Sequence, residues 1–548
     1  MHTTDFLSEI WARIEEEPGD VVKKLFLEFA RYVPEEVREI ALRSLDIRRE
    51  LHGYKGYISV VDELLPAVRQ LCESIKNGEY ELTMEYDYED ANWDDEWDDD
   101  EMLADPYGLN EQVVPLLEAA MHFIGEKHYA VPLLSLDELF SSELWIDGYE
   151  KISFFDLFSR GVLGLNAVLV LKYYAYAAIQ VFDNDARVEK LYEIMSLAPS
   201  LMRMQDVVSI SEDPITDRSD FCRQWIEYLI GRGLQKKEET LLLDAVIFSG
   251  GVDALKEFAH DHGNRYPAAF LKLLDIYELA GSFEDAKSIA LSGLEIHTAR
   301  SVERTAIADR LLALGKENNN EQVIEIAIVE GFKSSLDLVH YVALLKLGNA
   351  ALTKQAIVLF NEINEKSSRD YNYIAFLNGE YKAIWEECEK DRNFLGWSSS
   401  MKGEMLPLFI ALLGRSEEIG TCTMQLIKND FPYSYSNLEL FQNYALVLLQ
   451  SFATYLGDVP NEDIENYWEW CEEEISGRVD AIINGQHRSS YPKISALIVS
   501  FAETIVVKEG LSSATSYILS YKIKFPRHSA FHNCLRQDIA LAGFGKLF

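Results

Sequence analysis

Two short stretches of the sequence carry histidine, aspartate and cysteine side chains close enough together to suggest a metal site. They are His260, Asp261 and His262 in the first stretch, and His528, His532 and Cys534 in the second. A structural zinc ion usually takes four protein ligands, and neither stretch offers a fourth. We therefore interpret both as ordinary polar positions and expect neither a bound metal nor a cofactor.

Several large enzyme classes carry recognisable signatures, and this sequence lacks them. It has no G-x-x-x-x-G-K-[ST] loop, no G-x-S-x-G elbow and no H-E-x-x-H pair, which serve phosphate binding, serine hydrolysis and zinc proteolysis. Cys388 or Cys534 could act as a nucleophile only beside a basic side chain. Cys388 falls at a small-residue position of a helical repeat, where buried packing explains it. We expect the protein not to be an enzyme.

An acidic segment rich in aromatic residues is the strongest candidate for binding. Residues 85–105, here called the acidic tract, contain twelve acidic residues and no lysine or arginine. Like-charge repulsion opposes packing of such a run, so we expect residues 84–106 to form a disordered loop. A solvated linker is one interpretation, but tryptophan supplies contact area at interfaces. The candidate partner-binding residues are Trp93, Asp94, Asp95, Trp97 and Asp98.

The charge of the chain limits the partners it can attract. Fifty-one basic residues stand against 91 acidic ones, which gives a formal net charge of -40. Such a surface repels the phosphates of nucleic acids and of anionic membranes, so we expect neither as a direct partner. It attracts a basic protein. Plain solubility is the alternative explanation of the charge.

Cysteine usage and the N-terminus predict a cytoplasmic location. The six cysteines include no C-x-x-C pair, and the first residues lack the basic and apolar regions of a signal peptide. Residues 161–182 are the most apolar stretch, but Asn166, Lys172 and Gln180 interrupt it. We interpret this stretch as a buried helix rather than a membrane span.

The sequence as a whole predicts an all-α fold. Only 30 glycines and 14 prolines occur in 548 residues, and apolar residues recur at helical spacing between them. We expect an N-terminal helical bundle over residues 1–83, a helical domain over 107–245 and a C-terminal helical domain over 406–548. The final residues are locally basic, with Lys522, Lys524, Arg527, Arg536 and Lys546 close together in the sequence.

Residues 246–392 contain a degraded repeat. Tyr277 stands in one predicted helix, Gly281 ends it, Phe283 opens the next helix and Ala286 lies within it. A glycine allows the tight turn, and small residues on one helix face allow close packing. The later positions that we align with this first unit are Val323, Ala356, Leu377, Gly379, Tyr381 and Ile384. Four such units exceed the three that a stable stack needs, which predicts an α-solenoid.

This pattern resembles the tetratricopeptide repeat, a helical hairpin that stacks into solenoids used for protein binding. Residues 262–294 also resemble the helical tail of bacterial SWIM-type proteins. The zinc finger of those proteins is missing here, because no C-x-C pair precedes a C-x-H. Zinc and nucleic-acid functions are therefore not implied.

A further resemblance concerns the predicted loop over residues 393–405, NFLGWSSSMKGEM. Helical parts on both sides of an exposed loop are similar in plan to the protease substrate of type III-E CRISPR systems. The resemblance implies cleavage by a caspase-like protease between Met401 and Lys402. It also implies a sigma factor and the CRISPR-associated protease complex as partners in antiviral defence.

The interpretation favoured by the sequence is a non-enzymatic scaffold or adaptor that binds a partner protein through an acidic α-solenoid. The alternative is the regulated protease substrate described above.

Overall fold

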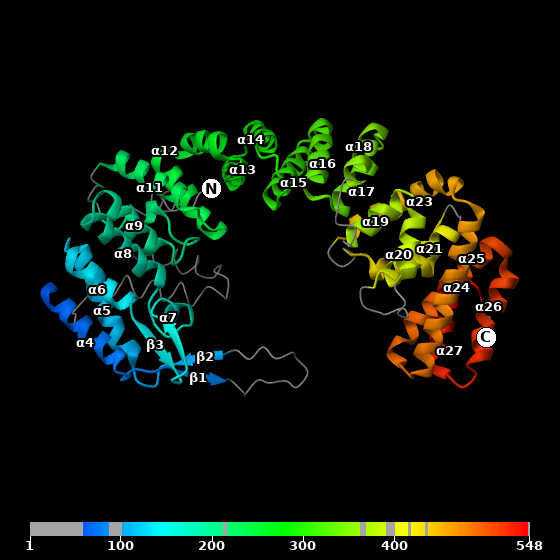
Figure 1. The fold of residues 1–548 in the computed structure, drawn as a ribbon, viewed down its shortest axis with the longest axis horizontal. Helices are drawn as coiled ribbons and strands as arrows, with labels where there is room; N and C mark the ends of the chain where they lie inside the picture. The colour runs from blue at the N-terminus through cyan, green and yellow to red at the C-terminus, as the bar shows by residue number, and fades with distance from the viewer. Residues whose placement is uncertain are drawn as a thin grey trace, which may run out of the picture. The chain divides into compact units, whose positions relative to one another are not determined.

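The computed structural model describes most of the chain, and these residues are predominantly helical (Figure 1). The described residues are 58–86, 101–211, 215, 217–361, 369–390, 400–414, 418–432 and 437–545. Among them are 24 α-helices and two small sheets, so the all-α prediction is confirmed. The chain divides into two compact units, residues 1–289 and 290–548.

The described part of the first unit is mainly helical. Its helices are α4 (Val61–Lys76), α5 (Leu109–Gly125), α6 (Ala130–Phe140), α7 (Asp156–Ser159), α8 (Ala167–Val181), α9 (Asn184–Met195), α10 (Met204–Val208), α11 (Arg218–Arg232), α12 (Glu239–His262) and α13 (Ala268–Leu279). The boundary between the units falls inside the next helix, α14 (Phe283–Ile296). Helix α12 is kinked at Gly250 and Gly251, where Gly251 has φ 71° and ψ −150°. A glycine takes this conformation without steric cost.

Two antiparallel hairpins accompany these helices. Strands β1 (Thr83–Tyr86) and β2 (Glu101–Ala104) form one, and β3 (Glu143–Ile146) and β4 (Glu150–Ser153) form the other. Neither was expected. The second hairpin falls in the predicted helical domain over 107–245, but Leu144 and Ile146 are buried while their neighbours in β3 are exposed. This alternation has the two-residue period of a strand and is too short to stand out in a helical sequence.

The apolar stretch over residues 161–182 forms a helix that is buried along its second half, in agreement with the predicted buried helix. Its helical part is α8, in which eight residues from Val170 to Ile179 are buried. Asn166 begins the helix, and its side chain accepts a hydrogen bond from the backbone N–H of Leu169 at 3.2 Å. The polar residue that interrupts the apolar run is therefore an N-cap.

All the regular secondary structure that is described in the second unit is helical. Its helices are α15 (Val302–Glu317), α16 (Glu321–Ser335), α17 (Leu338–Lys346), α18 (Ala350–Asn361), α19 (Arg369–Leu377), α20 (Tyr381–Lys390), α21 (Met401–Gly414), α22 (Thr421–Asp430), α23 (Leu438–Tyr455), α24 (Asn461–Asn484), α25 (Tyr491–Glu509), α26 (Leu511–Lys524) and α27 (Ser529–Leu541). One continuous apolar core runs from Ile328 in α16 to Ile539 in α27.

Helices α21 and α25 form the centre of this core. Each is buried on most of its circumference. Residues Arg488–Glu509, which include α25, are long and apolar enough to cross a membrane by composition, and 61% of their apolar window is buried inside the protein. Tyr467 and Trp470 of α24 pack against α21 through Phe409. These two aromatic residues therefore belong to the core.

Candidate interaction surfaces

The acidic tract leaves the first unit between two paired strands. Tyr86 of β1 lies opposite Glu101 of β2, so the ladder closes the base of the tract. The residues before β1 are attached to β3, because the backbone N–H of Leu82 donates to the carbonyl oxygen of Trp145 at 2.9 Å. The Asp147 carboxylate accepts a hydrogen bond from the backbone N–H of Met84 at 3.1 Å. The tract thus starts from a fixed point.

The end of the tract is fixed as well. The Asp105 carboxylate accepts hydrogen bonds from the backbone N–H groups of Leu109, at 2.8 Å, and Asn110, at 2.7 Å. It thereby satisfies donors in the first turn of α5. The prediction of a disordered loop over 84–106 is wrong at these ends, where β1, β2 and Asp105 are ordered. Trp93, Asp94, Asp95, Trp97 and Asp98 lie outside the described residues.

The first predicted repeat is a pair of helices, α13 and α14. Gly281 lies between them with φ +67°, a conformation that favours glycine. Tyr277 is buried in α13, and the Lys256 ammonium lies 5.0 Å from the centre of its ring. Phe283 begins α14, and the Ala286 side chain is fully buried.

The later repeat positions lie in the second unit. Gly379 has φ +78° between α19 and α20, and a Cβ atom there would lie 2.7 Å from Cγ of Tyr455. Tyr381 is buried, and its hydroxyl lies 3.4 Å from that of Ser451. Ala356 is buried in α18. The stacking of these units into a solenoid remains a prediction.

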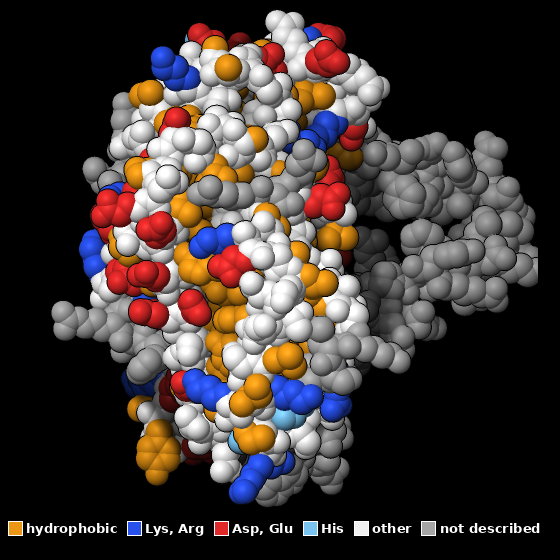
Figure 2. Space-filling view, turned by 90° about the vertical axis from the view of Figure 1, so that its right-hand side faces the viewer, with side chains coloured by type: hydrophobic (Ala, Val, Ile, Leu, Met, Phe, Trp, Pro, Cys, Tyr) orange, Lys and Arg blue, Asp and Glu red, His pale blue; other side chains and the backbone are white. Residues whose placement is uncertain are grey.

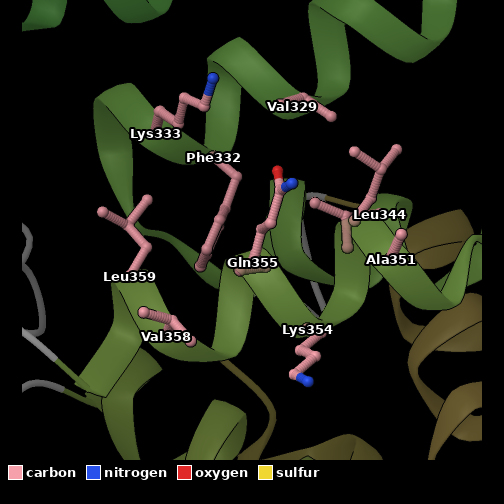
Figure 3. Close-up of a pocket in the computed structure, with 11 residues that line it drawn as sticks. Val329, Phe332, Lys333, Leu344, Ala351, Lys354, Gln355, Val358 and Leu359 are labelled. Atoms are coloured by element: carbon pink, nitrogen blue, oxygen red, sulfur yellow. The ribbon is translucent and has the colours of Figure 1, made fainter.

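An open apolar groove lies where α16, α17 and α18 meet (Figure 3). Its volume is about 610 Å³. Phe332 of α16 and Gln355 of α18 point into the space between the helices. Val358, on the α18 side, is 54% exposed although it is surrounded by apolar residues. The other apolar lining residues are Val329, Leu344, Ala351, Leu352, Ala356 and Leu359.

The charged residues that line the groove are two lysines. Lys333 and Lys354 extend away from Phe332 at opposite ends of the view. Lys333 is paired with Glu330, with 2.7 Å between its Nζ and the Glu330 Oε1. The Glu330 carboxylate also forms an ion pair with the buried Arg304 guanidinium. The groove is therefore an apolar surface with polar ends, the pattern of a site for a peptide or helix. Sequence reasoning had identified Ala356 only as a packing residue.

A buried histidine connects two of the helices that form this groove to α15. The His340 ring lies between two carboxylates, with Nε2 2.9 Å from Asp309 Oδ1 and Nδ1 2.8 Å from Asp337 Oδ1. Burial alone would lower the pKa of His340, but the hydrogen bonds and charges of both aspartates raise it to about 9. The ring occupies space that only glycine leaves open, since a Cβ on Gly331 would lie 2.3 Å from His340 Cδ2. His340 thus links α15, α16 and α17 as a cation.

The predicted exposed loop over 393–405 is wrong for its last five residues. Residues 391–399 lie outside the described residues, but Met401 begins α21. The Lys402 side chain is 7% exposed, and its Nζ lies 2.6 Å from Glu474 Oε1 of α24. The apolar run of α21 extends its helix back through Met401 and Lys402, which draws both into the core. Cleavage between them would require this turn to unfold and the ion pair to separate.

The cysteines and histidines singled out above are also placed. Burial raises the pKa of the Cys388 thiol to about 12, which disfavours the reactive thiolate. The pKa of Cys534 is raised as well, mainly by burial. His260 lies 2.9 Å from the Asp261 carboxylate on an exposed surface. Within the described part of the chain, no three His, Cys, Asp or Glu side chains are grouped to hold a metal ion.

Comparison with known proteins does not place this chain in a family. No protein-family model matches the sequence, and no curated protein matches it.

Proposed function

We propose that this protein is a cytoplasmic, non-enzymatic scaffold that holds a segment of a partner protein in the groove between α16, α17 and α18. The observation that carries the proposal is the exposed apolar lining of that groove. Val358 is 54% exposed, yet Phe332, which lines the same groove, belongs to the continuous core. Exposed apolar surface that continues into a core is typical of a binding site.

The charge of the chain favours a basic partner. With a formal net charge of -40, the protein attracts cationic surfaces and accelerates their encounter at low ionic strength. The groove would then supply the apolar contacts that hold the partner once it has arrived.

The test is affinity capture of the full chain from its native cells, followed by mass spectrometry. Val358→Glu places a charge on the groove wall. The control, Leu446→Glu, introduces the same charge on α23, away from the groove, at a position that is 57% exposed. Both changes are at the surface and should alter stability by about 0.5 kcal/mol or less. We expect Val358→Glu to lose the partner and Leu446→Glu to retain it.

Capture that is equal for both variants would refute binding in the groove. Recovery of a sigma factor or a caspase-like protease would support the alternative, in which the chain is a regulated protease substrate. Loss of the partner in high salt would support the electrostatic part of the proposal.

A further inference from the structure

The acidic side chains of α24 fall into two groups. The helix contains eight aspartates and glutamates but one arginine and no lysine. Three of the eight hold lysines of neighbouring helices: Asp463 pairs with Lys382 at 3.1 Å, Glu474 with Lys402 at 2.6 Å and Asp480 with Lys524 at 2.7 Å. These three carboxylates connect α24 to α20, α21 and α26, so their role is structural.

The second group is Glu469, Glu472 and Glu473, which we call the glutamate row. All three are exposed, and their spacing of three and four residues places them on one face of the helix. None of them forms an ion pair with a residue that the structure describes. Like charges at this spacing repel each other, so the row does not contribute to the stability of α24.

The glutamate row lines a pocket between α24 and α26. Both helices pack against α25, and the pocket between them has a volume of about 390 Å³. Tyr517 and Tyr521 supply its aromatic lining, with their ring centres 5.3 Å apart. Burial raises the pKa of Tyr521, and the negative charge of Glu472 raises it further, so this carboxylate lies close to the ring. The pocket thus combines carboxylates with aromatic faces.

Figure 2 views the molecule from the side of α26. Acidic side chains gather on this side next to a band of hydrophobic ones. The combination is open to solvent, since Glu469, Glu472 and Glu473 are exposed and Tyr517 is partly exposed. A partner can therefore reach both the charges and the rings.

Two lysines of the chain itself show how cations bind beside this pocket. The Lys508 ammonium lies 3.7 Å from the centre of the Trp468 ring, next to Glu469 in the sequence. Lys524 lines the pocket, but its Nζ is already 2.7 Å from Asp480 Oδ1. One lysine thus uses an aromatic face and the other a carboxylate. The pocket offers both kinds of contact, and the described residues place no unpaired cation in it.

The size and spacing of the site indicate a ligand larger than an ion. Among the described residues, no three acidic, histidine or cysteine side chains are grouped closely enough to hold a metal ion. Glu469 and Glu473 are separated by one helical turn, about 6 Å along the axis. A matching ligand carries positive charges at a similar separation, which is the spacing of residues four apart on a helix. Aromatic faces add a cation–π contribution to such a contact.

We propose that the pocket between α24 and α26 binds a helical segment of a partner protein that carries lysine or arginine residues one turn apart. The basic side chains pair with the glutamate row and lie against Tyr517. The net charge of -40 favours the approach of such a segment. This inference does not use the groove between α16, α17 and α18.

Two fluorescent peptides serve as probes. Each is an alanine-rich helix of about 18 residues, long enough to be helical in water. One carries two lysines four residues apart, and the other carries two glutamates at the same positions. Their binding to the full chain is measured by fluorescence anisotropy at physiological salt, where charges more than about 8 Å away are screened. We expect the lysine peptide to bind and the glutamate peptide not to bind.

Two triple variants separate the pocket from the net charge. The pocket variant combines Glu469→Gln, Glu472→Gln and Glu473→Gln. The control variant removes the same number of charges at exposed positions that do not line the pocket: Glu317→Gln, Glu386→Gln and Glu389→Gln. We expect the pocket variant to weaken binding of the lysine peptide by about tenfold, and the control variant to leave it unchanged.

Charge reversal gives the sharpest result. A variant with Glu469→Lys, Glu472→Lys and Glu473→Lys should bind the glutamate peptide and reject the lysine peptide. Val358→Glu should leave binding of the lysine peptide unchanged, so this test is separate from that of the groove. If Val358→Glu weakened it instead, the peptide would lie in the groove and the proposal would fail.

Four other results would overturn the proposal. The unaltered chain could bind neither peptide, or the pocket and control variants could weaken binding equally, which would leave only the net charge as the cause. Calcium chloride could displace the lysine peptide where sodium chloride of equal ionic strength does not, which would assign the pocket to a divalent cation. Sedimentation velocity could show self-association that the pocket variant loses, which would make a second copy of the chain the occupant.

Discussion

Helices α21 and α18 have similar lengths and are both largely apolar, yet the protein uses them differently. In α21, eleven residues from Lys402 to Leu413 are buried, including a lysine and a glutamate. In α18, only Ala356 and Phe360 are buried among the twelve residues, and Val358 faces solvent. The second unit thus encloses most of α21, whereas it covers α18 only in part.

The difference follows from the neighbours of each helix. α21 packs against α20, α22, α24 and α25, so each side of it meets another element. α18 packs mainly against α16 and α17, and Phe360 near its end stacks on Tyr371 of α19. Its remaining apolar surface is the groove wall. Apolar composition therefore serves stability in one helix and is available for binding in the other.

The largest expected effect is the loss of an aromatic side chain from α21. Phe409 is fully buried and contacts the rings of Phe376, Tyr467 and Trp470. Phe409→Ala should lower the free energy of unfolding by about 4 kcal/mol, because it leaves a cavity among packed rings. Val358→Ala in α18 should cost about 0.5 kcal/mol or less. Urea unfolding followed by circular dichroism measures both, and equal losses would remove the contrast between the helices.

The next effect concerns the ion pair that holds the first turn of α21. Lys402→Met leaves the Glu474 carboxylate, 14% exposed, without its cation. We expect a loss of about 3 kcal/mol. Adding Glu474→Leu should restore most of it, since an apolar pair of similar volume needs no partner. A double-mutant cycle, measured by urea unfolding, gives the coupling free energy between Lys402 and Glu474. If Lys402→Met were as stable as the unaltered chain, the ion pair would contribute nothing to stability.

Substitution of two glycines at equivalent repeat positions should lower the free energy of unfolding by different amounts. Gly379→Ala is strained by its positive φ and also by Tyr455, which lies 2.7 Å from the added Cβ, so we expect a loss of about 2 kcal/mol. Gly281→Ala meets no atom within 4 Å and should cost only about 1 kcal/mol, from the backbone alone. Thermal unfolding of the two variants is the comparison, and the reverse order would contradict the placement of Gly379 against α23.

The smallest effect is a pH dependence centred on His340. Its pKa is about 9 in the folded protein and 6.5 ordinarily. The protonated form is therefore favoured by folding, and this stabilisation is complete below pH 6.5 and is lost as the pH rises through 9. Because Asp309 is 55% exposed, we expect a loss of only about 1–2 kcal/mol.

His340→Gln is the control for this titration. It removes the ionisable ring, so its unfolding free energy should change less than that of the unaltered chain over the same pH interval. Parallel curves for the two proteins would mean that another group causes the dependence. Asp337, whose pKa His340 helps to lower, acts at the acid end and does not interfere.

Helical periodicity made most of the fold predictable. The glycine turn at Gly281 and the buried helix within residues 161–182 followed from residue types alone, because each depends on local spacing. Strand β3 was missed because four residues of alternation cannot be separated from a helical sequence without their partner β4. Lys402 was assigned to a loop because charge and nearby serines suggest exposure, whereas its burial depends on Glu474, 72 residues away.

The groove illustrates a different limit. The residues of α18 form an apolar helix face, and the sequence does not tell how much of that face its neighbours cover. The positions of α16, α17 and α19 decide that Phe360 is enclosed and Val358 is not, since the ring of Tyr371 in α19 stacks on that of Phe360. For the acidic tract, the composition was informative, but the paired strands at its base depend on contacts with Trp145 and Asp147 in β3 and its turn.

The β1–β2 ladder would hold the first unit together if the backbone between its two strands were cut. Both strands belong to the same compact unit, and four residue pairs join them. A protease that cuts once between residues 87 and 100 would therefore produce two polypeptides that remain a single particle, held by main-chain hydrogen bonds and by the packing on either side. A denaturing gel would separate the two polypeptides, whereas the mass of the particle in solution would not change. The chain could lose its covalent continuity there and keep its architecture.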